Sequence, residues 1–230
     1  MAPLSASSRS PSLLLALGDS VPAGSACACR PYPVLTARDV SAATHRRTRV
    51  SNEAVGGYTT EDVLQQLEPG SAVADSVRNA NAVMIEVGAN DVAHSDACGN
   101  DVACYQPEVT AMGDNLGAIV ARVRELNPTP ELPIVLLDYW SVWLGGDYAQ
   151  QQGDAYVSAA KSLTGMVNDR IGSVATSTKS GSVDLRRAFR GPSDRWDETN
   201  LLARDGEHPN ARGHHRIAGA VRRTIRVGRA

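Results

Sequence analysis

Short apolar runs alternate with longer amphipathic stretches along most of the chain. Five of these runs have the nearly continuous apolar pattern that is typical of buried strands. We predict strands over residues 12–18, 48–55, 81–88, 132–140 and 181–189. The second and fifth runs are weaker, as expected for strands nearer the edge of a sheet.

Between these runs, apolar residues recur three and four positions apart, which is the spacing of one helix face. This pattern predicts helices over residues 59–69, 109–128, 155–175 and 210–227. Thr59 or Thr60 precedes two acidic residues and is suited to cap the first of these helices, and Asn210 is suited to cap the last.

Apolar strands that alternate with helices favour a parallel sheet covered on both faces. We therefore expect one α/β domain, a three-layer α/β/α sandwich, over residues 12–230. Residues 1–11 are interpreted as a flexible leader. The chain contains no internal repeat, low-complexity tract or long linker.

In an open parallel sheet, ligands bind beyond the carboxyl ends of the strands. Polar groups follow the predicted strands at these positions: the sequence GDS at 18–20, the glycine pair at 56–57 and GAND at 88–91. A longer loop leads from the fifth strand to the sequence DGEHPN at 205–210. We expect these four segments to lie close together.

The overall composition excludes several classes of function. The chain has 230 residues, 42% of them hydrophobic, and a formal net charge of -2, so nothing indicates a nucleic acid or an anionic membrane as partner. The arginine-rich stretches 44–50 and 220–230 are interpreted as solvated faces. No apolar run reaches the roughly 18–20 residues of a transmembrane helix. We expect a monomer that acts on a small molecule.

Four cysteines form two local groups, Cys27 with Cys29 and Cys98 with Cys104. The even count and close spacing predict two disulfides and a secreted, extracellular protein. Local closure between Cys98 and Cys104 is preferred, whereas Cys27 and Cys29 would close a tight ring, so pairing across the two groups stays open. A four-thiolate zinc site is one alternative, although neither spacing is C-x-x-C, and four reduced thiols in a cytosolic protein are the other.

The first residues superficially imitate a signal peptide, because an arginine precedes the run LLLAL. That apolar run is short, and it leads into GDS rather than into a small-residue cleavage site. We therefore expect the export signal to be absent from this sequence.

The segments at the two ends of the chain carry the residue types of nucleophilic catalysis. A serine hydroxyl needs a histidine to remove its proton, and that histidine needs a carboxylate to orient it. Asp205 and His208 are three residues apart in one loop, which lets a single turn bring the carboxylate to the imidazole. Ser20 would then be the nucleophile at the end of the first strand.

Acyl transfer also needs hydrogen-bond donors for the developing oxyanion. The backbone N–H of Ser20 is one candidate, and a glycine N–H of the pair at 56–57 is the second, because a glycine backbone can approach a substrate closely. The side-chain amide of Asn90 is the third.

The sequences GDS, NEAVGGYT, GAND and DGEHPN occur in an order that resembles the four blocks of the SGNH hydrolases, also called GDSL-type esterases and lipases. The blocks extend from Gly18 to Asn210. Each block alone is a weak signal, but four in order are specific. The first block departs slightly, since Val21 replaces the leucine of GDSL.

The resemblance implies a flavodoxin-like sandwich with a five-stranded parallel sheet of order 2-1-3-4-5. It implies Ser20 as nucleophile, His208 as base and Asp205 as the acid that orients the base. It also implies an oxyanion hole formed by Ser20, Gly57 and Asn90, with Gly57 preferred to Gly56 because the family places this glycine five residues after the asparagine at position 52. Neither a metal nor an organic cofactor is required.

Trp140 and Trp143 follow the fourth strand in a chain that is only 4% aromatic. Half-exposed aromatic residues beside a catalytic face suit a wall that binds an acyl group or a sugar, and packing within the loop is the alternative. His94 has no role in the motifs, and His214 and His215 are interpreted as structural or solvated rather than as metal ligands.

We therefore expect a serine esterase or lipase that hydrolyses carboxylic esters through an acyl-enzyme. The compact chain has no long insertion to form a lid, which favours short to medium acyl chains or O-acetylated carbohydrates. Transfer of the acyl group to a sugar hydroxyl is one alternative, and a non-catalytic flavodoxin-like binding module is another.

Overall fold

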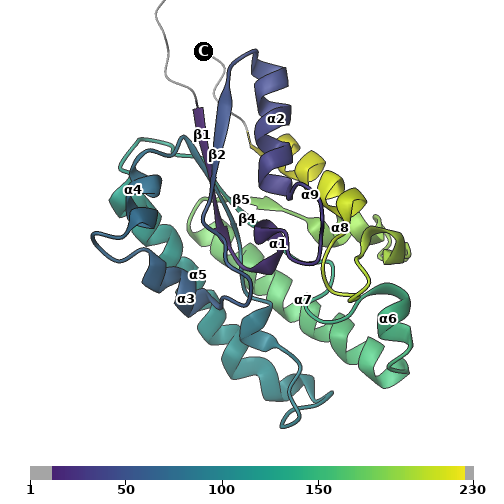
Figure 1. The fold of residues 1–230 in the computed structure, drawn as a ribbon. Coiled ribbons are helices and arrows are strands. Elements are labelled where there is room, and N and C mark those ends of the chain that lie inside the picture. Colours follow the sequence, from purple (N-terminus) through teal and green to yellow (C-terminus); the bar gives the residue numbers. More distant parts are fainter. Residues whose placement is uncertain (1–11, 226–230) are drawn as a thin grey trace, which may run out of the picture.

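A computed structural model describes residues 12–225 of the chain. Its centre is a five-stranded, entirely parallel sheet of strand order β2-β1-β3-β4-β5, as expected (Figure 1). The strands are β1 (Ser12–Gly18), β2 (Thr48–Asn52), β3 (Ala82–Glu86), β4 (Ile134–Leu137) and β5 (Gly181–Val183). The three-layer α/β fold is thus confirmed.

The connections between the strands contain helices of very different lengths. The α-helices are α1 (Ser20–Ala23), α2 (Tyr32–Thr44), α3 (Thr60–Gln66), α4 (Ala72–Arg78), α5 (Gln106–Leu126), α6 (Gly146–Gln150), α7 (Asp154–Ser177), α8 (Leu185–Arg190) and α9 (Ala211–Thr224). Three short 3₁₀ turns are η1 (Asn90–Val92), η2 (Val102–Tyr105) and η3 (Thr199–Leu201).

Alternating residues of β1 form two hydrophobic cores, one on each face of the sheet. Leu15 and Leu17 belong to the core made with α3, α4, α5 and α7, whereas Leu14 and Ala16 belong to the core made with α2, α8 and α9. All four side chains are fully buried. Burial stabilises the fold by roughly 1.5–3 kcal/mol per leucine, so this strand must be apolar on both faces.

Both predicted helix caps are present. The Thr59 hydroxyl accepts the backbone N–H of Asp62, and the Asp62 carboxylate accepts that of Thr59, which together form a capping box at the start of α3. The Asn210 side chain accepts the N–H groups of Arg212 and Gly213 at the start of α9.

One expectation about the elements was wrong, and one long helix was not predicted. The apolar run over 181–189 is a strand only as far as Val183, because the Asp184 side chain accepts the N–H of Arg187 and starts α8. Helix α2 was not predicted from the spacing, although it packs on the sheet beside α9. The predicted leader, residues 1–11, lies outside the described residues.

Within residues 12–225, no helix combines the length and the apolar character needed to cross a membrane.

Candidate active site

The turn between β1 and α1 presents Ser20 at the carboxyl end of the sheet. The N–H of Asp19 donates to the carbonyl oxygen of Glu86 at 3.1 Å, which holds the end of β1 against β3. Gly18 has φ +144°, and a Cβ atom there would lie 2.0 Å from the same carbonyl oxygen. Only glycine therefore lets the chain turn at this point.

Asp19 stabilises this turn through two hydrogen bonds. Its Oδ1 accepts the N–H of Val21 at 3.1 Å, and its Oδ2 accepts the hydroxyl of Tyr139 at 2.7 Å. Burial disfavours the charged carboxylate and raises the pKa of Asp19 to about 6, although both hydrogen bonds act in the opposite direction. Asp19 thus joins the Ser20 turn to the residues that follow β4, as a brace rather than as a reacting group.

Asp205 and His208 lie in one loop immediately before α9. The Asp205 carboxylate accepts the N–H groups of Glu207 at 3.1 Å and His208 at 3.0 Å through Oδ1. Its Oδ2 lies 2.8 Å from Nδ1 of the His208 ring. Partial burial opposes ionisation, but these hydrogen bonds lower the pKa of Asp205 below its ordinary value. The carboxylate thus orients the ring and leaves Nε2 available for other chemistry.

The same loop is tied to α6. Gly206 has φ +77°, and a Cβ atom there would lie 2.5 Å from the ring of Tyr148. The Gly206 carbonyl accepts the N–H of Gly145 at 2.9 Å. Since α6 begins beside this hydrogen bond, the position of the Asp205–His208 loop depends on α6 as well as on α9.

The glycine pair at 56–57 and Asn90 line the same cleft as Ser20. A Cβ atom on Gly56 would lie 3.9 Å from the Cβ of Ser20, whereas Gly57, at φ +86°, has open space around its Cα. Asn90 Nδ2 donates to the carbonyl of Tyr58 at 2.8 Å, which leaves its second amide hydrogen for another acceptor.

Asp91 holds these two segments together. Its carboxylate accepts the N–H of Thr60 at 3.0 Å and the Thr60 hydroxyl at 2.5 Å. Burial raises the pKa of Asp91 despite these hydrogen bonds. The contact joins η1 to α3 and so fixes Asn90 relative to the loop that contains Gly57.

One cleft of about 470 Å³, the main cleft, brings the predicted residues together. Its lining includes Ser20, Gly56, Gly57, Asn90 and His208. Among the described residues, no hydrogen bond joins the Ser20 hydroxyl to the His208 ring, a common situation in active sites without substrate. The arrangement has the parts needed for attack on a carbonyl carbon: a hydroxyl, an oriented imidazole and several N–H donors.

Trp140 and Trp143 line the main cleft, but the expectation that they are half exposed was wrong. Their exposed fractions are 2% and 3%. Trp140 stacks on Phe189 with ring centroids 4.3 Å apart, and Trp143 Nε1 donates to the carbonyl of Val92 at 2.8 Å. Both indoles are therefore packing residues that expose very little surface to the cleft.

His94 and Tyr156 also line the main cleft, although neither was predicted as a site residue. The His94 ring meets the edge of Trp143 at 4.7 Å between centroids and lies 5.5 Å from the ring of Tyr156. His94 follows Asn90 by four residues, and the short turn η1 carries it to the cleft. The short spacing from Asn90 could have placed His94 at the cleft, whereas nothing in the sequence indicated that Tyr156 of α7 would lie there.

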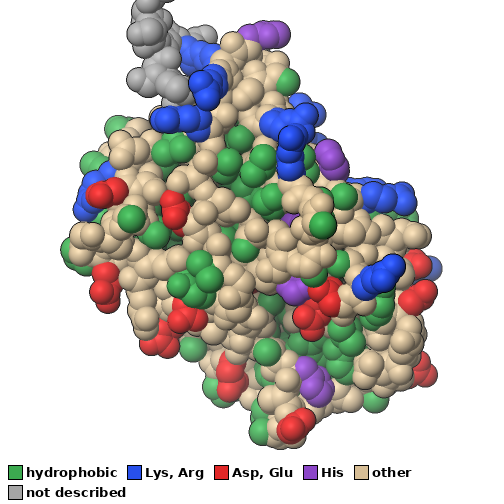
Figure 2. Space-filling view, in the orientation of Figure 1, with side chains coloured by type: hydrophobic (Ala, Val, Ile, Leu, Met, Phe, Trp, Pro, Cys, Tyr) green, Lys and Arg blue, Asp and Glu red, His purple; other side chains and the backbone are tan. Residues whose placement is uncertain are grey.

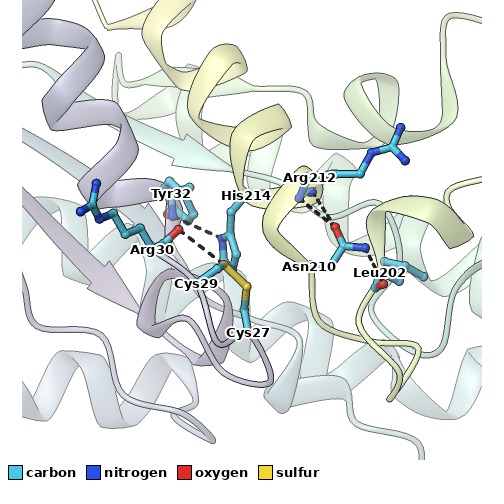
Figure 3. Close-up of a disulfide and its surroundings, with 9 residues drawn as sticks. Cys27, Cys29, Arg30, Tyr32, Leu202, Asn210, Arg212 and His214 are labelled. Atoms are coloured by element: carbon cyan, nitrogen blue, oxygen red, sulfur yellow. Dashed lines mark hydrogen bonds between the residues drawn. A yellow bond between two sulfur atoms is a disulfide. The ribbon is translucent and has the colours of Figure 1, made fainter.

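The structure contains a disulfide between Cys27 and Cys29 and another between Cys98 and Cys104, so each cysteine pairs within its own group. The first disulfide lies in the loop between α1 and α2, next to His214 of α9 (Figure 3). The two sulfurs and a ring nitrogen of His214 lie within 4.8 Å of one another. While the sulfurs are bonded to each other, they offer no thiolates to a metal.

His214 has a structural role. It is fully buried, and its Nδ1 accepts the N–H of Tyr32 at 3.2 Å, which ties α9 to the start of α2 (Figure 3). Burial lowers the pKa of His214 to about 4, so the ring is neutral at physiological pH.

Charged side chains of both signs are spread over the face seen in Figure 2. Lys and Arg lie mainly in the upper part of this view and Asp and Glu mainly in the middle and lower parts, while hydrophobic side chains are scattered over the whole face. This distribution agrees with the small net charge of the whole chain.

The chain matches the GDSL-like Lipase/Acylhydrolase family over residues 16–216. No curated protein matches it. A solved lipase from a goat rumen metagenome is similar in structure, with a TM-score of 0.77 and 17% sequence identity over 94% of this chain and 100% of that one. An acetylxylan esterase from Geobacillus stearothermophilus has a TM-score of 0.65 and 21% identity over 95% of each chain. At these identities, the two structures show a shared fold.

Proposed function

The chain belongs to the GDSL-like lipase/acylhydrolase family and is a carboxylic ester hydrolase, and we propose that it works through an acyl-enzyme on Ser20. The observation that carries this proposal is that Ser20 and His208 line one cleft, with His208 Nδ1 held 2.8 Å from Asp205. The expectation of a non-catalytic binding module was wrong, because family membership assigns the chain to the hydrolases.

In the proposed mechanism, the Ser20 oxygen attacks the ester carbonyl while its proton passes to Nε2 of His208. The negatively charged Asp205 stabilises the imidazolium that forms. The imidazolium then gives its proton to the departing alcohol, and the acyl group remains on Ser20. A water molecule, deprotonated by His208, attacks this acyl group and regenerates the serine.

Three donors would stabilise the oxyanion of each tetrahedral intermediate: the N–H groups of Ser20 and Gly57 and the side-chain amide of Asn90. Asn90 is suited to this role because one of its amide hydrogens already holds Tyr58 and thereby fixes the direction of the other. Donors fixed before the reaction stabilise the developing charge without a cost in reorganisation.

We propose short acyl chains, and acetyl esters of carbohydrates in particular, as substrates. Two bulky rings line the main cleft, Trp143 and Tyr156, with their centroids 5.4 Å apart, and such side chains favour a small acyl group. A structurally similar enzyme is an acetylxylan esterase, which supports the same class. Transfer of the acetyl group to a sugar hydroxyl would give a different product, and product analysis with and without a sugar acceptor distinguishes the two reactions.

The two disulfides support the proposal that the protein works in an oxidising, extracellular environment. Detection of the intact disulfides in protein recovered from culture medium, and not from the cytosol, is the corresponding test.

The mechanism is tested with Ser20→Ala, assayed on p-nitrophenyl acetate and with a fluorophosphonate probe. We expect the variant to lose turnover and labelling while its unfolding temperature stays near that of the unmodified protein. Ser173→Ala is the matched control, because this serine lies on α7 and bonds only to a helix carbonyl. Retained turnover in Ser20→Ala, or a probe adduct on another residue, would refute the role of Ser20.

A further inference from the structure

A second cleft, of about 320 Å³, adjoins the main cleft. The two clefts share Trp140 and Ser141 in their linings. The other walls of the second cleft come from α6, α7, α8 and the loop that follows α8. None of the four sequence blocks contributes to it, so its residues are not explained by the chemistry of ester hydrolysis.

Trp196 is the distinctive residue of this cleft. It is 52% exposed, whereas Trp140 and Trp143 are buried. Its indole packs against Gly191, where φ is +74° and an added Cβ atom would come within 2.4 Å of the ring. The backbone N–H of Trp196 donates to the Arg190 carbonyl at 2.9 Å. The indole is thus seated on a glycine backbone with much of its surface open to solvent.

A network of ion pairs holds the loop that carries Trp196. Asp194 accepts hydrogen bonds from Arg186 at 2.9 Å and from Arg190 at 2.8 Å. Arg190 also bonds to Glu198, which is 1% exposed and accepts the N–H of Gly146 at 2.9 Å. The loop is therefore fixed to both α8 and α6, and the indole is held in place before any ligand arrives.

The surroundings of the indole define the chemistry of a ligand. Side chains of both charges and an amide lie around the cleft, among them Asp147, Gln150 and Arg195. The lining is mixed: apolar side chains such as Leu144 and Val157 stand beside four basic and three acidic ones. Two of the basic side chains, Arg186 and Arg190, are already paired with Asp194 and Glu198, so the cleft suits neither a purely apolar acyl chain nor a simple anion best. A flat ring with an apolar face and hydroxyl groups at its edge matches an indole surrounded by donors and acceptors.

We propose that the second cleft binds the glycan part of an O-acetylated, β-1,4-linked oligosaccharide, with one pyranose ring stacked on Trp196. Where such a chain is built of glucose or xylose, every ring substituent is equatorial, so each ring presents a C–H face to the indole. The inference rests on the proposed function: the scissile acetyl group lies at Ser20 in the main cleft, and the glycan continues past Trp140 and Ser141.

Binding is tested without catalysis, in the Ser20→Ala protein. Iodide quenches exposed indoles, and Trp196 is the exposed one of the three tryptophans in the chain. We expect cellotetraose to protect the fluorescence from iodide in a saturable manner, and Trp196→Phe to remove both the quenching and the protection. Absence of protection, or protection by inorganic phosphate in place of cellotetraose, would overturn the proposal.

Turnover supplies the second test, with acetylated cello-oligosaccharides of one to four units. We expect kcat/KM to rise with length, and Trp196→Ala to reduce the value for the tetramer by about 2- to 10-fold. Trp196→Phe should restore part of this loss, and hydrolysis of p-nitrophenyl acetate should not change. Gln150→Ala removes an exposed side chain of the cleft and should lower kcat/KM selectively for the tetramer.

The two possible failures are distinguishable. Suppose that Trp196→Ala has the same kcat/KM as the unmodified protein on oligosaccharides of every length, while Ser20→Ala is inactive on p-nitrophenyl acetate. The proposed glycan site is then wrong and the proposed mechanism stands. If Ser20→Ala is active, the mechanism is wrong, and the fluorescence experiment still decides whether the second cleft binds a glycan.

Discussion

The carboxylate of Asp205 contacts both the ring and the backbone of His208: Oδ2 lies 2.8 Å from Nδ1, and Oδ1 accepts the His208 N–H at 3.0 Å. One side chain therefore fixes the conformation of the loop and the orientation of the imidazole. This double contact is possible because the two residues are three positions apart, with a glycine at φ +77° between them.

Asp205→Asn should reduce kcat on p-nitrophenyl acetate by roughly 10³–10⁴-fold. The amide oxygen can still accept the backbone N–H groups, but the amide nitrogen would face Nδ1 and favour the tautomer with hydrogen on Nε2. Steady-state kinetics would check this, with Asp39→Asn, at an exposed position of α2, as the control. A decrease of less than tenfold would contradict the orienting role.

Asn90→Asp should lower kcat by roughly 10²–10³-fold with little change in KM, because it replaces a donor to the oxyanion with a negative charge. Asn90 also bonds to Tyr58, so the unfolding temperature must be measured alongside the kinetics. Asn100→Asp changes an exposed residue in the same manner and should be neutral. A normal kcat in Asn90→Asp would remove this residue from the site.

Two glycine substitutions should have opposite effects on the free energy of unfolding. Gly18→Ala should lower it by roughly 3 kcal/mol or more, because its Cβ would overlap the Glu86 carbonyl at a positive φ. Gly117→Ala, in the middle of α5, meets no atom within 4 Å and should raise it by about 0.5–1 kcal/mol. Chemical denaturation would measure both, and a stable Gly18→Ala protein would contradict the packing of β1 on β3.

The buried Asp19 should make stability depend on pH. Its folded-state pKa is raised to about 6, so the folded protein holds a proton that the unfolded chain has already released. Stability therefore falls as the pH rises from about 4 to about 7, by roughly 3 kcal/mol for this group.

In the Asp19→Asn variant, the side chain at position 19 cannot ionise. The variant should therefore lack this part of the dependence of stability on pH. Urea denaturation over the same pH range would compare the two proteins, since the contribution of Asp138, whose pKa burial raises to about 7, is common to both. Parallel pH profiles would show that Asp19 does not titrate in this range.

The pattern of apolar residues predicted the three central strands well, because β1, β3 and β4 are buried on both faces and must be almost continuously apolar. The edge strands β2 and β5 are only partly buried, and their apolar runs are correspondingly weaker. The pattern failed at residues 181–189, where a capping aspartate starts a helix inside an apolar run. The strand order followed from the family resemblance, since the spacing of apolar residues carries no information about which strands pair.

The residues of the main cleft were predictable where each strand ends in a motif. The burial of Trp140 was not predictable, because it depends on stacking with Phe189, a residue on a different element. Trp196 was not predicted as a binding residue for a related reason. Its indole is held in place by packing on a glycine and by arginines that bond to its loop, and the sequence does not show these contacts.

Ser20 follows the first strand and His208 precedes the last helix, so almost the whole chain lies between two residues that line the same cleft. During synthesis, the cleft cannot close until α9 has packed beside α2. Esterase activity is therefore a reporter of completed folding: a refolding intermediate that lacks the docked α9 can be compact and helical but should not turn over an ester.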